Sequence, residues 1–347
     1  MKKLFLIIII AMLFSLLSCC KSPTGPDEYK DPRTYTWTID TLLYPGSFQT
    51  NMRSIWGSSV HDLYIVGHND RGYGKMFHFD GLKWSAIDPL PTGSIDLASV
   101  YGFSPNDIWT VGMEYIEPPG LGYYVDSSLI IHYDGTTWKE MQLPGRGRML
   151  QSVGGATPND VWAGGTNVLF HFDGVSIKHY PIYIPPQGIQ LGFIVALSTS
   201  EVYMAGYRND VTQPLDSSFH YLYRFNGSSW DIIDSTLQGT SQANFGPQLT
   251  LIDHQMYSAG GGVWKWIGNG WNKLFDEEWI YHVGGSSANN LFACGGLATL
   301  YHYNGTDWKK LALPINQDVA FYTVWTDGVE AFIIGNDGYK TYIVHGK

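Results

Sequence analysis

Cysteine is scarce in this chain: 347 residues contain 3. Cys19 and Cys20 are adjacent near the N-terminus, and Cys294 stands alone inside an apolar, strand-like stretch. A disulfide framework or a cysteine metal site needs several cysteines spaced along the folded part of the chain. The sequence therefore predicts neither, and we expect Cys294 to be a small buried hydrophobic residue.

Basic residues are also few. The chain has 21 Lys and Arg against 31 Asp and Glu, which gives a formal net charge of −10, and only 15% of its residues are charged. Nucleic acids and anionic lipid surfaces reward clusters of Lys and Arg, and no such cluster is present. The composition therefore argues against nucleic acid as a partner. Low charge together with 15% aromatic residues is typical of one large domain of packed sheets.

Long apolar runs are absent except for one at the N-terminus. Residues 4–17 are apolar apart from Ser15, and Lys2 and Lys3 precede them. A membrane-spanning helix needs about 20 apolar residues, so this shorter run is typical of a secretory signal peptide. An ordinary signal peptide followed by a coincidental cysteine is one interpretation of the segment.

The favoured interpretation is a lipoprotein signal. Leu16-Leu17-Ser18-Cys19 resembles the bacterial lipobox, and that resemblance implies cleavage before Cys19 and diacylation of its sulfur. Cys20 fits the pattern less well, because a cysteine would then precede the cut. We expect a signal peptide over 1–18, a lipidated flexible tether over 19–33, which contains three prolines and a glycine, and a folded domain over 34–347.

What the chain has in abundance is a repeat. The clearest copy has Ser-Val-Tyr-Gly at 99–102, Asp-Ile-Trp at 107–109, His-Tyr-Asp-Gly at 132–135 and a Trp at 138. Similar copies start at Ser54 and Ser152, and later copies are more degenerate. A period of roughly 40 to 50 residues with four short strand-like runs is typical of a β-propeller blade.

Each run predicts one strand. Alternation such as Phe77-His78-Phe79 places both aromatic side chains on one face of a strand. The Asp-Gly or Asn-Gly that follows indicates a hairpin with a type I′ turn, in which both central residues have positive φ. We therefore expect strand a at the Ser-Val-Tyr-Gly run, strand b at Asp-Ile-Trp, strand c at Ile-His-Tyr and strand d from the Trp onward.

The two ends of the chain predict how the ring closes. The last unit stops after its c-type run at 341–346, and an orphan d-type run stands at 35–40 around Trp37. Pairing these two segments would complete the last blade and remove two free sheet edges. We predict an all-β fold, a seven-bladed propeller of four-stranded antiparallel blades closed by the strand near Trp37. Six or eight blades are the alternatives, because the fourth and fifth units are degenerate.

The most regular polar residues are interpreted as structural. Histidines at equivalent c-strand positions would radiate away from one another, so they cannot share a metal ion, and we expect no metal and no cofactor. The Asp residues that start the b strands should fix the a–b turns through backbone hydrogen bonds. The tryptophans should pack sheet against sheet. These sets are His78, His132, His171 and His302; Asp62, Asp107 and Asp160; and Trp37, Trp84, Trp138, Trp230, Trp271 and Trp308.

Residues that break the repeat are the candidates for binding. In an antiparallel blade the b–c and d–a connections lie on one face of the disk, and here they carry nearly all the length variation. Long loops on a rigid scaffold commonly carry function. Their aromatic, carboxylate and amide groups suit a glycan or a protein. The candidate ligand-binding residues are Asp70, Arg71, Tyr73, Glu114, Tyr115, Glu117, Tyr123, Tyr124, Asp126, Tyr207, Arg208, Asp210 and His220.

The repeat also resembles that of a known group. Residues 99–112 and 132–138 resemble secreted bacterial propeller proteins with Ser-Val-Trp-Gly-Ser-Ser-Pro-Asn-Asp-Val-Trp-Ala-Val-Gly and His-Tyr-Asp-Gly-Thr-Thr-Trp repeats, and the likeness covers about residues 35–347. In outline the chain is similar to kelch and Asp-box propellers. It lacks the kelch pattern, and Asp134 lies one residue closer to Trp138 than an Asp box requires. Sialidase catalytic residues are therefore not carried over.

The expected function is a binding module of the bacterial cell envelope. The module would be a monomer, lipid-anchored at the outer membrane, and would bind a glycan or an envelope protein through the b–c and d–a connections. Its contact with the membrane would be through the anchor alone. One alternative is a carbohydrate-active or other hydrolase, with a carboxylate pair such as Glu114 and Glu117, or Asp126 and Asp210. The other is a scaffold of an envelope assembly. No recognisable catalytic motif is present, so a non-enzyme is favoured.

Overall fold

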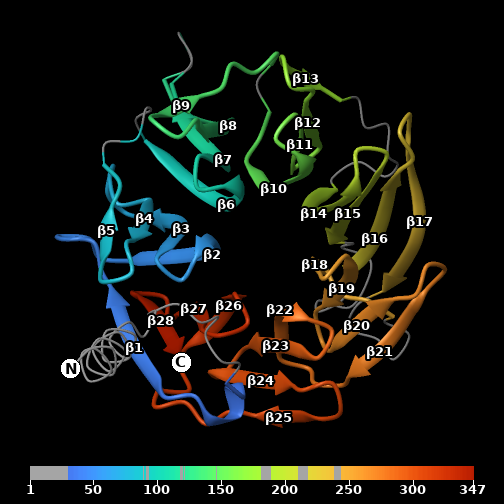
Figure 1. Cartoon of the computed structure of the whole chain (residues 1–347). Helices are drawn as coiled ribbons and strands as arrows, with labels where there is room; N and C mark the ends of the chain where they lie inside the picture. The colour runs from blue at the N-terminus through green and yellow to red at the C-terminus, as the bar shows by residue number, and fades with distance from the viewer. Residues whose placement is uncertain are drawn as a thin grey trace, which may run out of the picture.

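The computed structural model describes residues 30–88, 90, 94–117, 120, 122–145, 147–180, 189–209, 218–237 and 244–347. In this part the chain forms seven four-stranded antiparallel sheets arranged in a ring, the seven-bladed propeller predicted from the repeat (Figure 1). The predicted signal peptide, most of the tether with Cys19, and Asp210 lie outside the described residues. A short 3-10 helix, η1 (Pro32–Thr34), precedes the first strand.

Strands a to d follow one another outward from the axis in each blade. Blade 1 consists of β2 (Thr50–Ser59), β3 (Asp62–Asn69), β4 (Met76–Phe79) and β5 (Trp84–Ala86), and blade 2 of β6 (Ile95–Ser104), β7 (Asp107–Ile116), β8 (Val125–Tyr133) and β9 (Trp138–Glu140). Blade 3 consists of β10 (Leu150–Thr157), β11 (Asp160–Gly165), β12 (Val168–Phe172) and β13 (Ile177–His179), and blade 4 of β14 (Gln190–Ser198), β15 (Glu201–Asn209), β16 (Ser218–Phe225) and β17 (Trp230–Leu237).

The remaining three blades follow the same order. Blade 5 consists of β18 (Gln248–Ile252), β19 (Gln255–Ala259), β20 (Val263–Trp266) and β21 (Trp271–Phe275), and blade 6 of β22 (Ile280–Ser287), β23 (Asn290–Gly295), β24 (Thr299–Tyr303) and β25 (Trp308–Lys310). Blade 7 consists of β26 (Ala320–Thr326), β27 (Ala331–Asn336) and β28 (Thr341–Gly346), with β1 (Trp37–Leu42) as its fourth strand.

The ring closes as predicted. β1 pairs antiparallel with β28 from Trp37↔Gly346 to Leu42↔Thr341, so the first strand of the chain is strand d of the last blade. Thr36 and Lys347 extend the pairing by exchanging two backbone hydrogen bonds, of 2.9 and 3.2 Å. In Figure 1 the blue β1 lies beside the red β28. A free edge that would otherwise invite strand pairing with another molecule is thereby covered.

The recurrent histidines are structural, as expected. His132 stacks on Trp109 of strand b with 4.1 Å between ring centroids, and its Nε2 lies 2.9 Å from Asp107 Oδ1. The same contact recurs between His78 and Asp62 at 2.8 Å and between other pairs around the ring. The Asp side chains therefore bond a histidine ring. The expectation that they fix the a–b turns by accepting backbone N–H groups was wrong.

That capping role belongs to the c–d turns instead. Asp134 Oδ1 accepts the backbone N–H groups of Thr136 and Thr137 at 3.0 and 2.9 Å. Gly135 has φ 86°, whereas Asp134 does not have positive φ. The connection is thus a four-residue turn in which only the glycine takes the left-handed conformation, and the predicted type I′ geometry was wrong. The Asp side chain fixes the turn by making local hydrogen bonds.

Neighbouring blades pack through the tryptophans that open the outer strands. Trp138 stacks on Tyr133 of its own blade at 5.0 Å and meets Tyr64 of blade 1 edge-on at 5.9 Å. Trp308 of blade 6 stacks on Phe275 of blade 5 at 4.7 Å. Cys294 in β23 is fully buried, and burial raises the pKa of its thiol, which matches a structural role.

Candidate functional site

The b–c and d–a connections share one face of the disk, here called the loop face. The a–b and c–d turns occupy the opposite face. The N-terminal segment reaches the propeller on this opposite face: Arg33 forms a 3.0 Å ion pair with Asp307 in the c–d turn of blade 6. Arg33 also donates to the backbone oxygens of Asp307 at 2.6 Å and His302 at 3.3 Å. The loop face is therefore the one away from the N-terminal entry.

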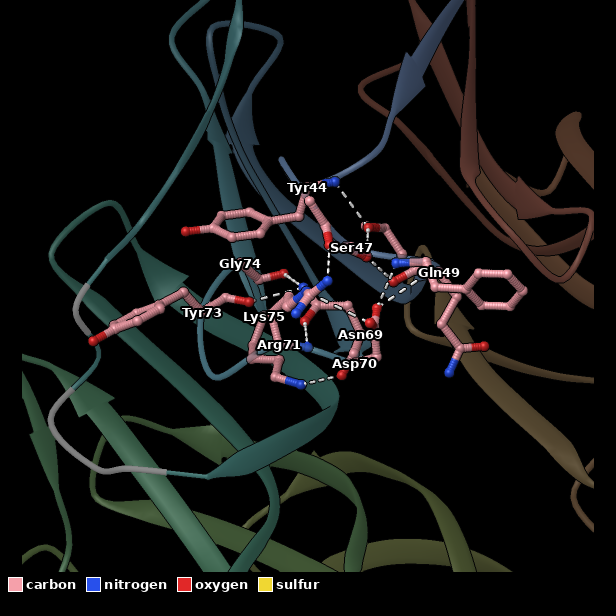
Figure 2. Close-up of polar contacts among 12 residues, drawn as sticks. Tyr44, Ser47, Gln49, Asn69, Asp70, Arg71, Tyr73, Gly74 and Lys75 are labelled. Carbon is pink, nitrogen blue, oxygen red and sulfur yellow. Dashed lines mark hydrogen bonds and ion pairs between the residues drawn. The ribbon is translucent and has the colours of Figure 1, made fainter.

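Asp70 and Arg71 hold two connections together on the loop face. Asp70 Oδ1 accepts the backbone N–H groups of Phe48 and Gln49 at 2.8 and 3.2 Å, and hydrogen bonds from the backbone lower the pKa of its carboxyl. The guanidinium of Arg71 donates to the oxygen of Gly46. Figure 2 shows these side chains between the two loops. Both predicted residues thus join the d–a connection before β2 to the b–c connection of blade 1, and Tyr73 beside them is 54% exposed.

A buried ion pair lies beneath these loops. Lys75, whose side chain is 5% exposed, places Nζ 3.0 Å from Asp96 Oδ1 and donates to the oxygen of Asn69. The hydroxyl of the predicted residue Tyr115 donates to Asp96 Oδ2 at 3.1 Å. Burial and the charge of Asp96 raise the pKa of Tyr115 to about 12. Lys75 was not predicted from the sequence, because the partner carboxylate belongs to the next blade.

Blade 2 projects a hairpin rather than an irregular loop. The b–c connection was predicted to be a long loop, but β7 continues to Ile116 and β8 starts at Val125, so Tyr115 pairs with Asp126 and Glu114 with Ser127. The hairpin forms because the alternating residues on both strands continue the antiparallel ladder. Glu117 follows the end of β7. Near the tip, Tyr123 and Tyr124 are 57% and 66% exposed.

The predicted residues of blade 4 lie at the inner end of the same face. Tyr207 and Arg208 belong to β15 and His220 to β16, where Tyr207 pairs with His220 and Arg208 with Phe219. The Tyr207 hydroxyl donates to Oε1 of Gln190, which also accepts from Gln151 Nε2 at 3.0 Å. His220 is 5% exposed, and burial lowers its pKa to about 4. Its imidazole is thus neutral at pH 7.

A cavity of about 870 Å³ lies on the propeller axis. Residues of the innermost strands of all seven blades line it, from β2 in blade 1 to β26 in blade 7 (Figure 1). Tyr207 and His220 are the two predicted ligand-binding residues among the lining residues. The other predicted residues that the structure describes are not among the lining residues.

A β-bulge turns side chains into this cavity. Near the start of six of the seven innermost strands the pairing with strand b skips one or two residues, which is where a bulge re-aims a side chain. Each skipped position contributes a lining residue, and Phe193, Tyr281 and Tyr322 are 41%, 38% and 38% exposed. We call this set the bulge ring; its members are Arg53, Ala98, Gln151, Phe193, Tyr281 and Tyr322.

The cavity differs in charge from the rest of the protein. Its described lining contains no Asp, Glu or Lys, and Arg53 is its one basic residue. Two histidines, His220 and His282, complete the titratable set apart from tyrosines, and burial lowers the pKa of each to about 4. At pH 7 the lining therefore carries a single positive charge, whereas the whole chain carries a net charge of −10.

The bulge ring also corresponds to a fixed position in the sequence repeat, which was not predicted to bind a ligand. Each ring residue immediately precedes the first residue of the repeat, as Arg53 precedes Ser54, Ala98 precedes Ser99 and Gln151 precedes Ser152. The serines are structural: Ser54 Oγ accepts the N–H of Val100 in blade 2 at 3.1 Å. The ring position varies between Arg, Ala, Gln, Phe and Tyr, whereas the next residue is Ser in the first three blades. A variable position on a repeated strand is where a repeat protein can vary its ligand contacts.

The described residues contain no group of three or more His, Cys, Asp or Glu side chains placed to hold a metal ion. No helix in that part of the chain is both long enough and apolar enough to cross a bilayer.

Comparison with known proteins supports the fold. No protein-family model and no curated protein sequence matches the chain. Among solved structures, YCF48 bound to D1 peptide is similar, with a TM-score of 0.60 and 14% identity over 94% of this chain and 98% of that one. The WD40 β-propeller domain of Doa1 has a TM-score of 0.58 and 13% identity, over 89% and 97%.

A third similar structure is the extracellular domain of the hybrid two-component system BT3049 from B. thetaiotaomicron. Its TM-score is 0.58 at 12% identity, covering 89% of this chain and 42% of that one. At identities this low, the similarity shows the propeller fold alone.

Proposed function

We propose that this chain is a binding module of the bacterial cell envelope that holds a peptide segment of a protein partner at the loop-face mouth of the axial cavity. The bulge ring carries this proposal: six blades each present one side chain, of five residue types in all, to one cavity of about 870 Å³. Aromatic side chains and Arg are the residue types that dominate protein recognition, and the ring contains both.

Two further observations favour a protein partner. Phe48 and Tyr339, next to the inner strands on the loop face, are 72% and 58% exposed and lie edge to face at 5.6 Å. Exposed aromatic side chains on the same face as a pocket add surface that a peptide could cover beyond the pocket itself. One similar structure is YCF48 bound to D1 peptide, so this fold accommodates peptide binding in at least one protein.

The proposal includes a lipid anchor at Cys19. Because Arg33 is fixed to the c–d turn of blade 6, the described chain begins on the face opposite the loop face. An anchor joined through residues 19–29 would leave the loop face accessible to a partner. Labelling with an alkyne fatty acid should mark the wild-type protein and not C19S; equal labelling of both would contradict the choice of cysteine.

The binding site is tested with matched surface variants. F193S and Y281S shorten two exposed side chains of the bulge ring, while L82S and V175S shorten side chains that are 91% and 90% exposed in c–d turns of the opposite face. Partner capture from envelope extract should fall at least tenfold for the first pair and stay unchanged for the second, because aromatic contacts commonly contribute about 2 kcal/mol each. Equal capture by all four variants would refute the site.

The same variants decide between the partner classes. A glycan array probed with the wild-type protein and with F193S tests the glycan alternative directly. Glycan binding that depends on Phe193, without any captured protein, would replace the peptide proposal with a glycan-binding module at the same cavity.

A further inference from the structure

The charge distribution around Arg53 points to the kind of peptide that enters the cavity, and this inference rests on the proposed function. We propose that Arg53 binds the carboxylate of an acidic side chain, Asp or Glu, in a partner segment that lies across the loop-face mouth.

Arg53 is placed for this role by the backbone. It is the skipped residue between Met52 and Ser54 in the pairing of β2 with β3, its side chain is exposed, and it lines the cavity. It is the fourth residue of β2, so about 10 Å of strand separates it from the start of the strand at the loop face. The carboxylate of a segment crossing the mouth can approach a long Arg side chain over such a distance.

Arg53 has no carboxylate of its own. Among the described residues no Asp or Glu lies within ion-pair distance of its guanidinium, in contrast to Arg33, Arg71 and Arg224. The carboxylate near the start of the neighbouring inner strand, Asp96, is already held by Lys75 at 3.0 Å and by the hydroxyl of Tyr115 at 3.1 Å.

The surrounding groups leave a net positive charge at this point. His68 of β3 is flanked by Arg53, Lys75 and Asp96, and burial together with Arg53 lowers its pKa, so it is neutral at pH 7. Two cations and one carboxylate sum to one positive charge. The described lining of the cavity contains no acidic side chain that would repel a ligand carboxylate at this site.

The energetics favour an ionic contact here over one on the open surface. A charged pair bounded by protein interacts more strongly than a fully solvated pair, since less water screens it. The chain as a whole, at a net charge of −10, repels acidic ligands at a distance. Recognition of a carboxylate therefore requires a local, unpaired cation, and Arg53 is the residue that supplies it. A planar guanidinium also matches the carboxylate fork.

The aromatic members of the bulge ring indicate which residues should flank the acidic residue in the bound peptide. The rings of Tyr281 and Tyr322 stack on each other in the cavity lining, with their planes 26° apart and their centroids 6.4 Å apart. Phe193 contributes a third exposed ring. A matching segment carries apolar or aromatic residues beside its acidic residue. Such a segment combines burial of apolar area with one charge-assisted hydrogen bond.

The experiment uses the purified protein and arrays of synthetic decapeptides. One array carries a single Glu flanked by apolar and aromatic residues at varied spacing, with an amidated C-terminus. A second array has Gln in place of Glu. A third has Gln and a free C-terminal carboxylate. Binding is measured for the wild type, for R53Q and for K139Q, which removes an equal charge from a side chain that is 63% exposed on the opposite face.

We expect the wild type and K139Q to bind Glu peptides at least tenfold more tightly than their Gln counterparts, since a hydrogen bond to a charged group is stronger than one between neutral groups. R53Q should bind the two arrays equally. R53K should recover part of the preference. Melting curves of R53Q matching the wild type would show that the variant is folded.

Several outcomes would overturn the inference. Equal binding of Glu and Gln peptides by the wild type, or a Glu preference that survives in R53Q, removes Arg53 from the role. Tighter binding to the third array assigns the carboxylate to a chain end instead of a side chain. Peptides that bind through Phe193 and Tyr281 without any Glu preference would refute this inference alone, whereas no binding to any array would refute the proposed function as well.

Discussion

His302 differs from the other c-strand histidines in the residue that it faces. His78, His132 and His171 each face an Asp carboxylate, whereas His302 Nε2 lies 2.9 Å from the amide oxygen of Asn290. His302 is fully buried, and this burial, with Arg33 nearby, lowers its pKa from 6.5 to about 4 against the opposing charges of Asp31 and Asp307. A neutral imidazole is thus built into blade 6.

This difference predicts that the unfolding free energy depends on pH. Below pH 6.5 the unfolded chain takes up a proton on His302 that the folded chain does not, so stability falls as the pH drops from 6.5 to 4, by at most about 3 kcal/mol from this residue. N290D places a carboxylate beside Nε2, raises the pKa of His302 and should flatten the slope. Urea unfolding at pH 7.5, 6 and 5 measures it.

The control for N290D is the same substitution at the exposed Asn159 in an a–b turn of blade 3. N159D should show the pH slope of the wild type. His220 and His282, whose pKa values burial also lowers to about 4, keep their share of the slope in both variants. If N290D shows the full wild-type slope, then His302 contributes nothing to it.

At the scale of elements, the Lys75–Asp96 pair joins two blades. Lys75 is the last residue of the b–c connection of blade 1, and Asp96 is the second residue of β6 in blade 2. Both side chains are largely buried, at 5% and 17% exposure. The pair therefore fixes the connection that carries Asp70 and Arg71 against the next inner strand.

Removing one partner of this pair should be costly. D96N leaves the Lys75 ammonium buried without a counter-charge, and we expect a loss of about 3 kcal/mol or more in unfolding free energy. D276N breaks the exposed pair with Lys273, where the Asp276 side chain is 84% exposed, and should cost no more than about 1 kcal/mol. Denaturant unfolding at pH 7 compares the two; equal losses would show that the buried pair has no special role.

At the scale of the whole molecule, the ring is closed by the pairing of β1 with β28, which we call the clasp. β1 contributes a full strand to blade 7, and Arg33 adds contacts to blade 6. Without β1, the outer edge of β28 would be open, and an open edge strand pairs with other chains.

Truncation tests the clasp. A chain starting after Leu42 should melt at a lower temperature than a chain starting at Lys30, and should self-associate as its concentration rises. Calorimetry and analytical ultracentrifugation follow the two effects. A truncated chain that remains monomeric and melts at the same temperature as the longer chain would show that the six residue pairs between β1 and β28 contribute little to stability.

Much of the architecture could be predicted because its determinants are local. The aromatic, His and Gly pattern around His132 and Gly135 specifies strand, turn and returning strand within a few residues, and its repetition gives the blade count. The orphan run around Trp37 predicted the closing strand for the same reason. The interpretation of Asp107 went wrong in detail because its partner, His132, lies 25 residues away.

The candidate site could be predicted only in part. Sequence reasoning identified the loop face and named Tyr207 and His220, which line the cavity. It did not find Arg53, because a bulge depends on how β2 pairs with β3 and not on the residue itself. Asp70 and Arg71 have the composition of a binding loop, but their hydrogen bonds join two connections of this chain.

The sequence by itself determined the fold class, the seven blades and the pairing of the first strand with the last, because alternation, turn chemistry and repetition act over short distances. The tertiary structure decided which side chains face the axis and which carboxylates have partners. Those properties arise only when seven inner strands, six of them with an equivalent bulge, surround one cavity, and when residues of neighbouring blades, such as Lys75 and Asp96, lie together and leave Arg53 unpaired.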